Sequence, residues 1–193
     1  MIIGILVTDG FEDAEMTTFS DLLGRFEIEY KLIACKDSCE LKSYFGLRII
    51  ADNILKDVLK EEFDALVLVG GPRNSISLSE NKELISFIKS HDEKGRYIFA
   101  QCSAPARILG KNGLLKGRHY TCSSNLQNEI SDGIYEDLDI VKDGNLVTSK
   151  GLGVVIDYTL YCCNLLLKDK KRVDAQEEHI YHKRSELLKI REF

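Results

Sequence analysis

Residues 97–109 constrain the fold most, because they combine a short apolar run, a cysteine and the start of a helix. The run at 97–101 is long enough for a buried strand and too short for a helix. After Cys102 the pattern changes: Ser103 is a good helix cap, and Pro105 suits the first turn of a helix. The sequence therefore predicts a sharp strand-to-helix turn with Cys102 at the carboxyl edge of a sheet.

A cysteine at such a turn is predicted to be reactive. The backbone N–H groups of the new helix form a positive pole, which favours the thiolate over the thiol, and the thiolate is the reactive form. Enzymes with a nucleophile elbow use the same strand–turn–helix geometry. The alternative is that Cys102 is a small side chain packed between strand and helix, as cytosolic cysteines commonly are.

Strands and helices alternate along the chain. Alternation of this kind predicts one α/β domain over residues 1–193, with a mostly parallel sheet covered by helices on both faces and right-handed crossovers. A hairpin is expected around Gly144 and a last helix from Ala175 onward. The main strands are expected at 2–8, 28–34, 65–69 and 97–101, and the main helices at 14–24, 80–91 (capped by Ser79) and 154–167.

Composition narrows the classes of partner. The net charge of −5 argues against nucleic acid or an anionic membrane surface. The longest apolar stretch, 154–167, carries Asp157 and is too short to span a bilayer. The amino terminus lacks the basic flank of a signal peptide. We therefore expect a cytoplasmic protein, with no membrane or nucleic-acid partner, whose six cysteines are free thiols.

No metal or dinucleotide cofactor is expected. The chain has no Cys-x-x-Cys pair, and His179 and His182 lie in a charged tail that is typical of a solvated surface. The segment Gly151-Leu152-Gly153 has Ile156 where a dinucleotide-binding loop needs its third glycine.

Three segments are expected to meet beyond the carboxyl ends of the strands, where ligands bind in parallel sheets. They are the turn at 9–15, the pair Gly70-Gly71, and Cys102. Glu15 lies one turn into the first helix, and a position beside Cys102 is one role open to it. The alternative role for Glu15 is a carboxylate that only stabilises the helix amino terminus.

Four segments together carry a resemblance: Gly10–Glu15, Leu68–Gly71, Ala100–Pro105 and Asp143–Gly153. On these motifs the chain is identified as a member of the ThiJ/PfpI superfamily, in the branch of the parkinsonism-associated protein and its bacterial relatives. The resemblance covers essentially the whole chain. It implies a flavodoxin-like three-layer sandwich, a homodimer and a cofactor-free site.

The resemblance also implies a function. Cys102 is expected to attack small reactive carbonyls in glyoxalase or deglycase chemistry, and to oxidise readily. Glu15 is expected to be protonated beside the thiolate and to shuttle a proton. The backbone N–H groups of Gly71 and Ser103 are the expected oxyanion donors, with an ordinary tight turn as the alternative.

Three positions depart from the family pattern. Ser103 stands where the peptidase branch has a histidine, and Ala104 replaces a glycine. Cys122 stands where close relatives have a histidine, and His119 falls on the opposite face of its strand. Cys122 is therefore either a third site residue or a packed core thiol. The missing histidine keeps a second function open, namely a redox-responsive stress sensor or chaperone that signals through Cys102 oxidation.

Overall fold

The fold is built on an eight-stranded sheet in the order β12-β10-β11-β7-β6-β1-β2-β5. The computed structural model describes all residues, 1–193. From β11 to β5 every pairing is parallel, and β10 pairs antiparallel with β11. The strands are β1 (Ile2–Val7), β2 (Glu29–Ala34), β5 (Asn53–Ile54), β6 (Ala65–Leu68), β7 (Tyr97–Gln101), β10 (Ile140–Asp143), β11 (Leu146–Ser149) and β12 (Ile190–Glu192).

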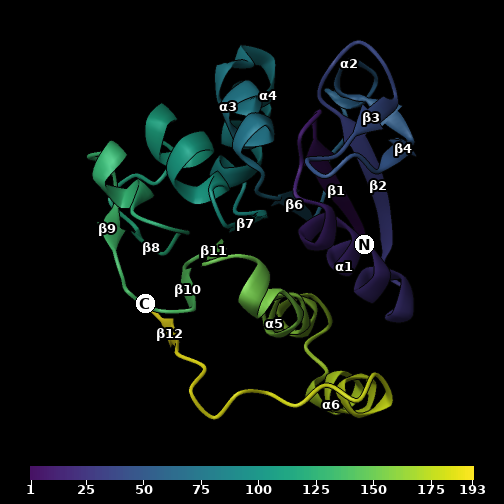
Figure 1. Ribbon diagram of the computed structural model, residues 1–193, viewed down its shortest axis with the longest axis vertical. Coiled ribbons are helices and arrows are strands. Elements are labelled where there is room, and N and C mark those ends of the chain that lie inside the picture. The colour runs from purple at the N-terminus through teal and green to yellow at the C-terminus, as the bar shows by residue number, and fades with distance from the viewer.

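Helices cover both faces of this sheet, as Figure 1 shows. The helices α1 and α5 pack on one face and α3 and α4 on the other, which produces two separate apolar cores. The predicted flavodoxin-like three-layer α/β sandwich is therefore confirmed. The helices are α1 (Asp13–Arg25), α2 (Leu55–Val58), α3 (Pro72–Glu80), α4 (Lys82–Glu93), α5 (Val155–Leu167) and α6 (Lys170–His179).

The central strands are buried on both sides, which is why they read as continuous apolar runs. In β1, Ile5 and Val7 enter the core beside α1 and α5, whereas Leu6 enters the core beside α3 and α4. Side chains alternate between the two faces of a strand, so consecutive apolar residues fill opposite cores.

Small two-stranded units flank the main sheet. The strands β3 (Glu40–Lys42) and β4 (Arg48–Ile50) form an antiparallel hairpin around Gly46. The strands β8 (His119–Tyr120) and β9 (Ile134–Tyr135) pair separately, in parallel.

The helices on the second face differ from the prediction. No helix was predicted at α3, which begins with Pro72 directly after the Gly70-Gly71 turn. The cap of α4 is Asn81 rather than Ser79, because the Asn81 side chain accepts a hydrogen bond from Leu84 N–H at 3.1 Å. The helix expected after Cys102 is present, but it is irregular: a π-helical segment, Pro105–Leu109, continues directly into a 3₁₀ turn, Gly110–Asn112.

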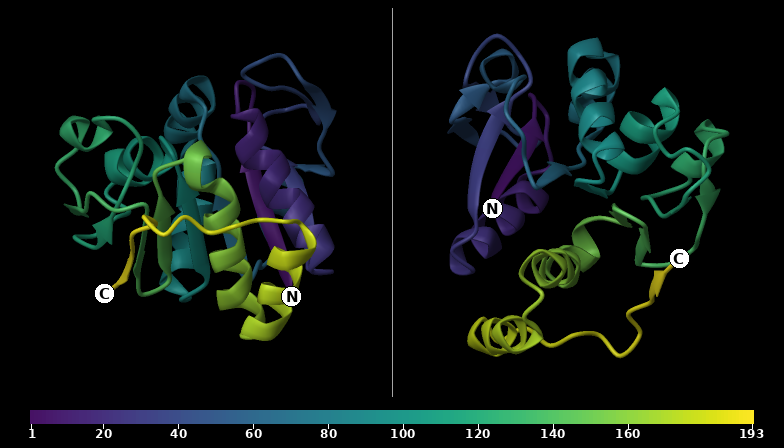
Figure 2. Two further views of the ribbon diagram at one scale, coloured as in Figure 1. Left: turned by 60° about the horizontal axis from the view of Figure 1, so that its bottom comes forward. Right: turned by 180° about the vertical axis from the view of Figure 1, so that it is seen from behind.

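The prediction of one terminal helix from Ala175 onward was also wrong. The helix α6 begins earlier, at Lys170, and ends at His179. The chain then runs along the outer side of α5 and closes the sheet edge as β12 (Figure 2). His182, which was expected to be solvated, instead lies 2.9 Å from Asp157 on α5. This contact is long-range, so local charge could not indicate it.

None of the helices combines the length and the apolar character that crossing a bilayer requires.

Candidate functional site

The carboxyl ends of β6, β7 and β11 bring Cys102 and Glu15 together, as predicted. A Cβ atom built at Gly70 falls 2.8 Å from Cys102 Sγ and 2.8 Å from Glu15 Oε2. One built at Gly151 falls 3.2 Å from Cys102 Sγ and 3.1 Å from Glu15 Oε1. Both glycines are therefore required by close approach, since any side chain would displace the carboxyl or the sulfur.

Cys102 occupies a strained turn. Its φ is +59°, in the left-handed region that non-glycine residues rarely adopt. Backbone hydrogen bonds on both sides hold it there: Cys102 N–H donates to Ser149 O, and Ser123 N–H donates to Cys102 O, each at 2.9 Å. Strain of this kind persists only where surrounding structure enforces it, and it is common at functional sites. The side chain of Cys102 is half-buried.

Glu15 is fully buried and is positioned by the Gly70-Gly71 turn between β6 and α3. Its Oε2 accepts a hydrogen bond from Gly70 N–H at 2.7 Å, while its Oε1 is buried without a hydrogen-bond partner. Burial is the largest influence and raises the pKa of Glu15 to about 7, against the lowering effect of the Gly70 N–H. Glu15 therefore holds a proton through much of the range below neutral pH, as predicted.

Glu12, three residues before Glu15, caps the helix α1. Its side chain accepts a hydrogen bond from Glu15 N–H at 2.7 Å and so caps α1. Because the cap fixes the start of α1 at Asp13, Glu15 lies in the first turn of the helix, at the edge of the sheet. Of the acidic residues in the first turn of α1, Glu15 is fully buried.

The expected low pKa of Cys102 is contradicted. Burial, followed by the negative charge of Glu15, raises the pKa of Cys102 to about 12. The contacts that favour the thiolate are the Ser123 side chain and the Ser103 N–H, and they are too few to outweigh burial.

These two groups form a coupled pair. A thiolate at Cys102 is disfavoured while Glu15 is ionised, because the Glu15 charge raises the pKa of the thiol. When Glu15 is protonated, that repulsion is absent and the carboxylic acid donates a hydrogen bond to sulfur. The pair therefore accommodates one negative charge rather than two near neutral pH.

The expected oxyanion donors flank Cys102. Gly71 has a φ of +100°, and a Cβ built there falls 2.2 Å from Gly10 O, so this turn requires glycine. Gly71 N–H makes no hydrogen bond within the chain. Ser103 N–H contacts the Cys102 sulfur, and Ser103 Oγ donates to Ser75 Oγ at 3.0 Å. Their role as oxyanion donors stays a prediction.

Cys122 is buried close by but has no polar contact with Cys102 or Glu15. Burial raises its pKa to about 11. It lines a polar cavity of about 450 Å³ together with Ser123, Tyr135 and Lys150. His119 is engaged elsewhere, because its Nδ1 lies 2.8 Å from Glu136 Oε1.

Three polar residues of this region were missed by the sequence analysis. Ser123 contacts the Cys102 sulfur through its side chain. Gln101 and Ser149 are fully buried at the ends of β7 and β11. Gln101 could have been noticed, because it is a polar residue in an apolar run and directly precedes Cys102. Nothing in the sequence around Ser123 or Ser149 indicated that they belong to this region.

Curated proteins similar to this chain include two that are named as enzymes. A glutathione-independent glyoxalase of Caenorhabditis elegans is 30% identical over 81% of this chain and 83% of that protein. A deglycase of Thermococcus kodakarensis is 30% identical over 77% of this chain and 89% of that protein. The chain spans little more than a third of the length of two Arabidopsis thaliana relatives, 35% and 39%.

Solved structures show the same fold. A DJ-1 superfamily protein from Salmonella typhimurium, determined as a cysteine-to-alanine mutant, is 41% identical. It superposes with a TM-score of 0.93 over 95% of this chain and 99% of that one. The model of the DJ-1/PfpI family matches residues 1–164, which include every site residue discussed above. The chain therefore belongs to the DJ-1/PfpI family, the ThiJ/PfpI superfamily predicted from its motifs.

Proposed function

We propose that this protein is a cofactor-free enzyme, one ThiJ/PfpI domain in extent, that acts on small reactive carbonyls through Cys102 and Glu15. The observation that carries the proposal is the approach of both side chains to Gly70, with Glu15 Oε2 held by Gly70 N–H at 2.7 Å. A nucleophile next to a carboxyl group whose pKa is raised to about 7 is suited to proton transfer near neutral pH.

The proposed reaction begins when the Cys102 thiol gives its proton to ionised Glu15, and the resulting thiolate Sγ attacks the aldehyde carbon of a 2-oxoaldehyde such as methylglyoxal. A C–S bond forms, the carbonyl π electrons move to oxygen, and that oxygen takes the proton of Glu15. The N–H groups of Gly71 and Ser103 would stabilise the developing charge. The product of this step is a hemithioacetal.

Glu15, now ionised, would remove the C–H proton of the hemithioacetal and return it to the neighbouring carbon, while the hydroxyl proton of the hemithioacetal passes to the former ketone oxygen. This transfer leaves a thioester of a 2-hydroxy acid on Cys102, which water hydrolyses. The aldehyde carbon is oxidised and the ketone carbon is reduced, so that no external oxidant or cofactor is needed. The net change is addition of one water molecule to the substrate.

Metal-free protein should therefore convert methylglyoxal to lactate, and Cys102→Ser should remove this activity. Lactate is measured enzymatically after treatment of the protein with chelator. A wild-type rate equal to that of Cys102→Ser would refute the glyoxalase activity. Release of a free amine from a methylglyoxal–amino-acid adduct tests the deglycase reaction separately, which the name of the Thermococcus relative favours.

The second candidate is a redox-responsive stress sensor or chaperone in which Cys102 is oxidised and turnover is slow. Exposure favours this candidate: Cys102 and Cys39 are half-buried, whereas Cys35, Cys122, Cys162 and Cys163 are buried. Peptide mass spectrometry after titrated peroxide should find Cys102 oxidised first; equal oxidation at Cys39 would remove the case for a specialised thiol.

A homodimer in the cytoplasm remains part of the proposal. Large apolar side chains of the β3–β4 hairpin are exposed, namely Tyr44, Phe45, Leu47 and Ile50. Contiguous exposed apolar side chains are typical of interaction surfaces. Light scattering of the purified protein tests the dimer.

A further inference from the structure

Behind the Cys102–Glu15 pair, four buried polar atoms have no hydrogen-bond partner. They are Glu15 Oε1, both amide atoms of Gln101, and Ser149 Oγ. All three residues are 0% exposed. A buried polar atom without a hydrogen bond is destabilising, so native proteins rarely tolerate one, and a group of four indicates a bound molecule.

The strands place Gln101 and Ser149 side by side. The two residues are register partners on β7 and β11, so their side chains project from the same face of the sheet. Two residues earlier, Phe99 and Val147 enter the core formed with α1 and α5. Because side chains alternate with a period of two, Gln101 and Ser149 also face α1 and α5.

Glu15 approaches from α1 on this same face. A Cβ built at Gly151 falls 3.1 Å from Glu15 Oε1, and Gly151 is two residues beyond Ser149. Cys102, which follows Gln101, is joined to the other strand by its N–H bond to Ser149 O. The ends of both strands therefore border the unpartnered carboxyl oxygen.

The chemistry of this cluster fits water better than an ion. Gln101 supplies a donor and an acceptor, Ser149 supplies a hydroxyl that does either, and Glu15 Oε1 accepts. Buried waters make about three such bonds. An anion finds no cation here, and no group of three His, Cys, Asp or Glu side chains is arranged to hold a metal ion.

We propose that Gln101 and Ser149 hold an internal water molecule that donates a hydrogen bond to Glu15 Oε1. Gln101 is then a positioning residue that determines which member of the pair, Glu15 or Cys102, carries the negative charge. The inference rests on the part of the proposed function that couples these two side chains, and it does not depend on the identity of the substrate.

The other titratable groups that act on this pair are few. The negative charge of Glu12, at the start of α1, raises the pKa of Glu15. The charge of Glu15 in turn raises the pKa of Tyr158 on α5. The Tyr158 hydroxyl donates to Val147 O at 3.0 Å, so it is committed elsewhere. Gly70 N–H and the Cys102 side chain favour the ionised form of Glu15, and neither Glu12 nor Tyr158 supplies a donor to Oε1, so the proposed water adds a further donor at that oxygen.

Loss of that water should keep the proton on Glu15 and move the charge to sulfur. We expect Gln101→Met, a change to an unbranched apolar side chain of similar length, to speed alkylation of Cys102 by iodoacetamide about threefold to tenfold at pH 8. At pH 5.5, where Glu15 is protonated in both proteins, the rates should be equal. Rates are measured on the Cys102 peptide by mass spectrometry.

Matched variants separate this effect from general disruption. Gln176→Met on α6 changes another glutamine that has a buried unpartnered amide nitrogen, and it should leave the profile unchanged. Ser149→Ala should shift the profile in the same direction as Gln101→Met, and it carries the test if that variant does not fold. In a Glu15→Gln background, neither change should alter the pH profile.

The Tm gives an independent reading. A water-satisfied Gln101 predicts that Gln101→Met lowers the Tm, whereas an amide left unpartnered predicts a higher Tm on its removal. A Gln101→Met profile equal to wild type, an effect that persists in Glu15→Gln, or a raised Tm would each overturn the proposal. Failure of lactate formation alone would refute the glyoxalase activity and leave this test intact.

Discussion

Two buried carboxyl groups at opposite ends of the sheet have pKa values shifted in opposite directions. Glu15, at the carboxyl ends of the strands, has one backbone hydrogen bond, and burial raises its pKa to about 7. Asp92, at the end of α4, has a side chain only 5% exposed, yet its pKa is lowered.

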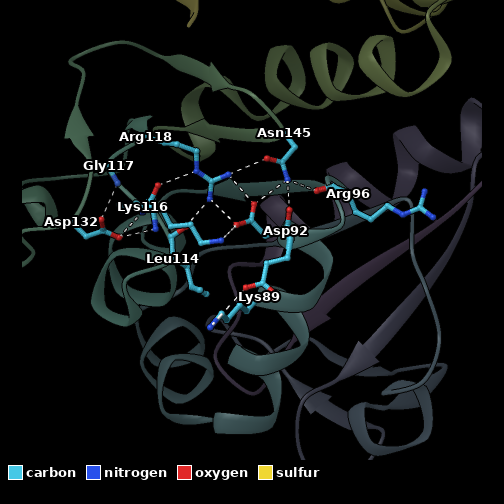
Figure 3. Close-up of polar contacts among 11 residues, drawn as sticks. Lys89, Asp92, Arg96, Leu114, Lys116, Gly117, Arg118, Asp132 and Asn145 are labelled. Carbon is cyan, nitrogen blue, oxygen red and sulfur yellow. Dashed lines mark hydrogen bonds and ion pairs between the residues drawn. The ribbon is translucent and has the colours of Figure 1, made fainter.

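The difference lies in the donors around each carboxyl group. Although burial is the largest influence on Asp92 and raises its pKa, hydrogen bonds from Lys116, Arg118 and Asn145 together outweigh burial. Arg118 Nη1 and Lys116 Nζ each lie 2.8 Å from Asp92, and Asn145 Nδ2 lies 3.0 Å away (Figure 3). A buried acid is thus ionised or neutral according to its donors, and the functional end of this sheet provides few.

The largest expected effect tests the proton of Glu15. Glu15→Gln keeps a hydrogen-bond donor for the Cys102 sulfur but removes the transferable proton, so lactate formation should fall by about 10³-fold. Selective oxidation of Cys102 should persist. Steady-state rates and peroxide titration measure the two; a variant with near wild-type turnover would show that Glu15 is a structural residue like Asp92.

The next prediction uses the opposite pKa shifts as a pH test. The folded-state pKa of Glu15 is about 7 and its unfolded value is 4.5, so its contribution to stability is present below pH 4.5 and declines as pH rises toward 7. The loss is about 3 kcal/mol, because each pKa unit corresponds to about 1.4 kcal/mol. Asp92 has the opposite sign: its contribution is present above pH 4 and declines as pH falls through its lowered pKa.

Urea unfolding at pH 5 and pH 8 measures how the free energy of unfolding changes with pH. Wild type should lose stability between the two values, and Glu15→Gln should lose much less. Equal slopes in the two proteins would mean that Glu15 titrates normally in the folded state.

The third prediction concerns removal of the negative charge of Asp92. Asp92→Asn should lower the free energy of unfolding at pH 7 by about 2 kcal/mol, because the half-buried Arg118 loses its ionic partner while Lys116 is exposed enough to be hydrated. Alkylation of Cys102 should not change, since the two carboxyl groups share no neighbours. A change in Cys102 reactivity would show that the two ends are coupled.

The smallest effect concerns a third group at the functional end. If Cys122 borders the reacting atoms, Cys122→His should raise turnover by about tenfold, because a neutral imidazole transfers protons near pH 7 better than a thiol whose pKa is raised to about 11. Rates for wild type, Cys122→His and Cys122→Ala decide this. Three equal values would place Cys122 outside the chemistry, as a packed core thiol.

Local sequence patterns predicted much of this protein. The apolar run before Cys102, the Gly70-Gly71 stop and the hairpin around Gly144 each depend on residues close together in the chain, and β7, β6 and the β10–β11 pair follow from them. The placement of Cys102 and Glu15 at one sheet edge followed from the topology of parallel sheets. The tail was predicted poorly, because β12 exists only through its pairing with β10.

Only the tertiary structure decided the charge states. Glu15 is held by Gly70, 55 residues away, and Asp92 is held by Asn145, 53 residues away. The family resemblance implied a protonated Glu15, but the residues next to Glu15 and Asp92 in the chain do not themselves indicate that one has a raised pKa and the other a lowered one. A pKa depends on desolvation and on the donors that reach the carboxyl group, and both are properties of the packed interior rather than of the local chain. The sequence by itself therefore determined where the cysteine and the acid lie, and the fold determined which of them is charged.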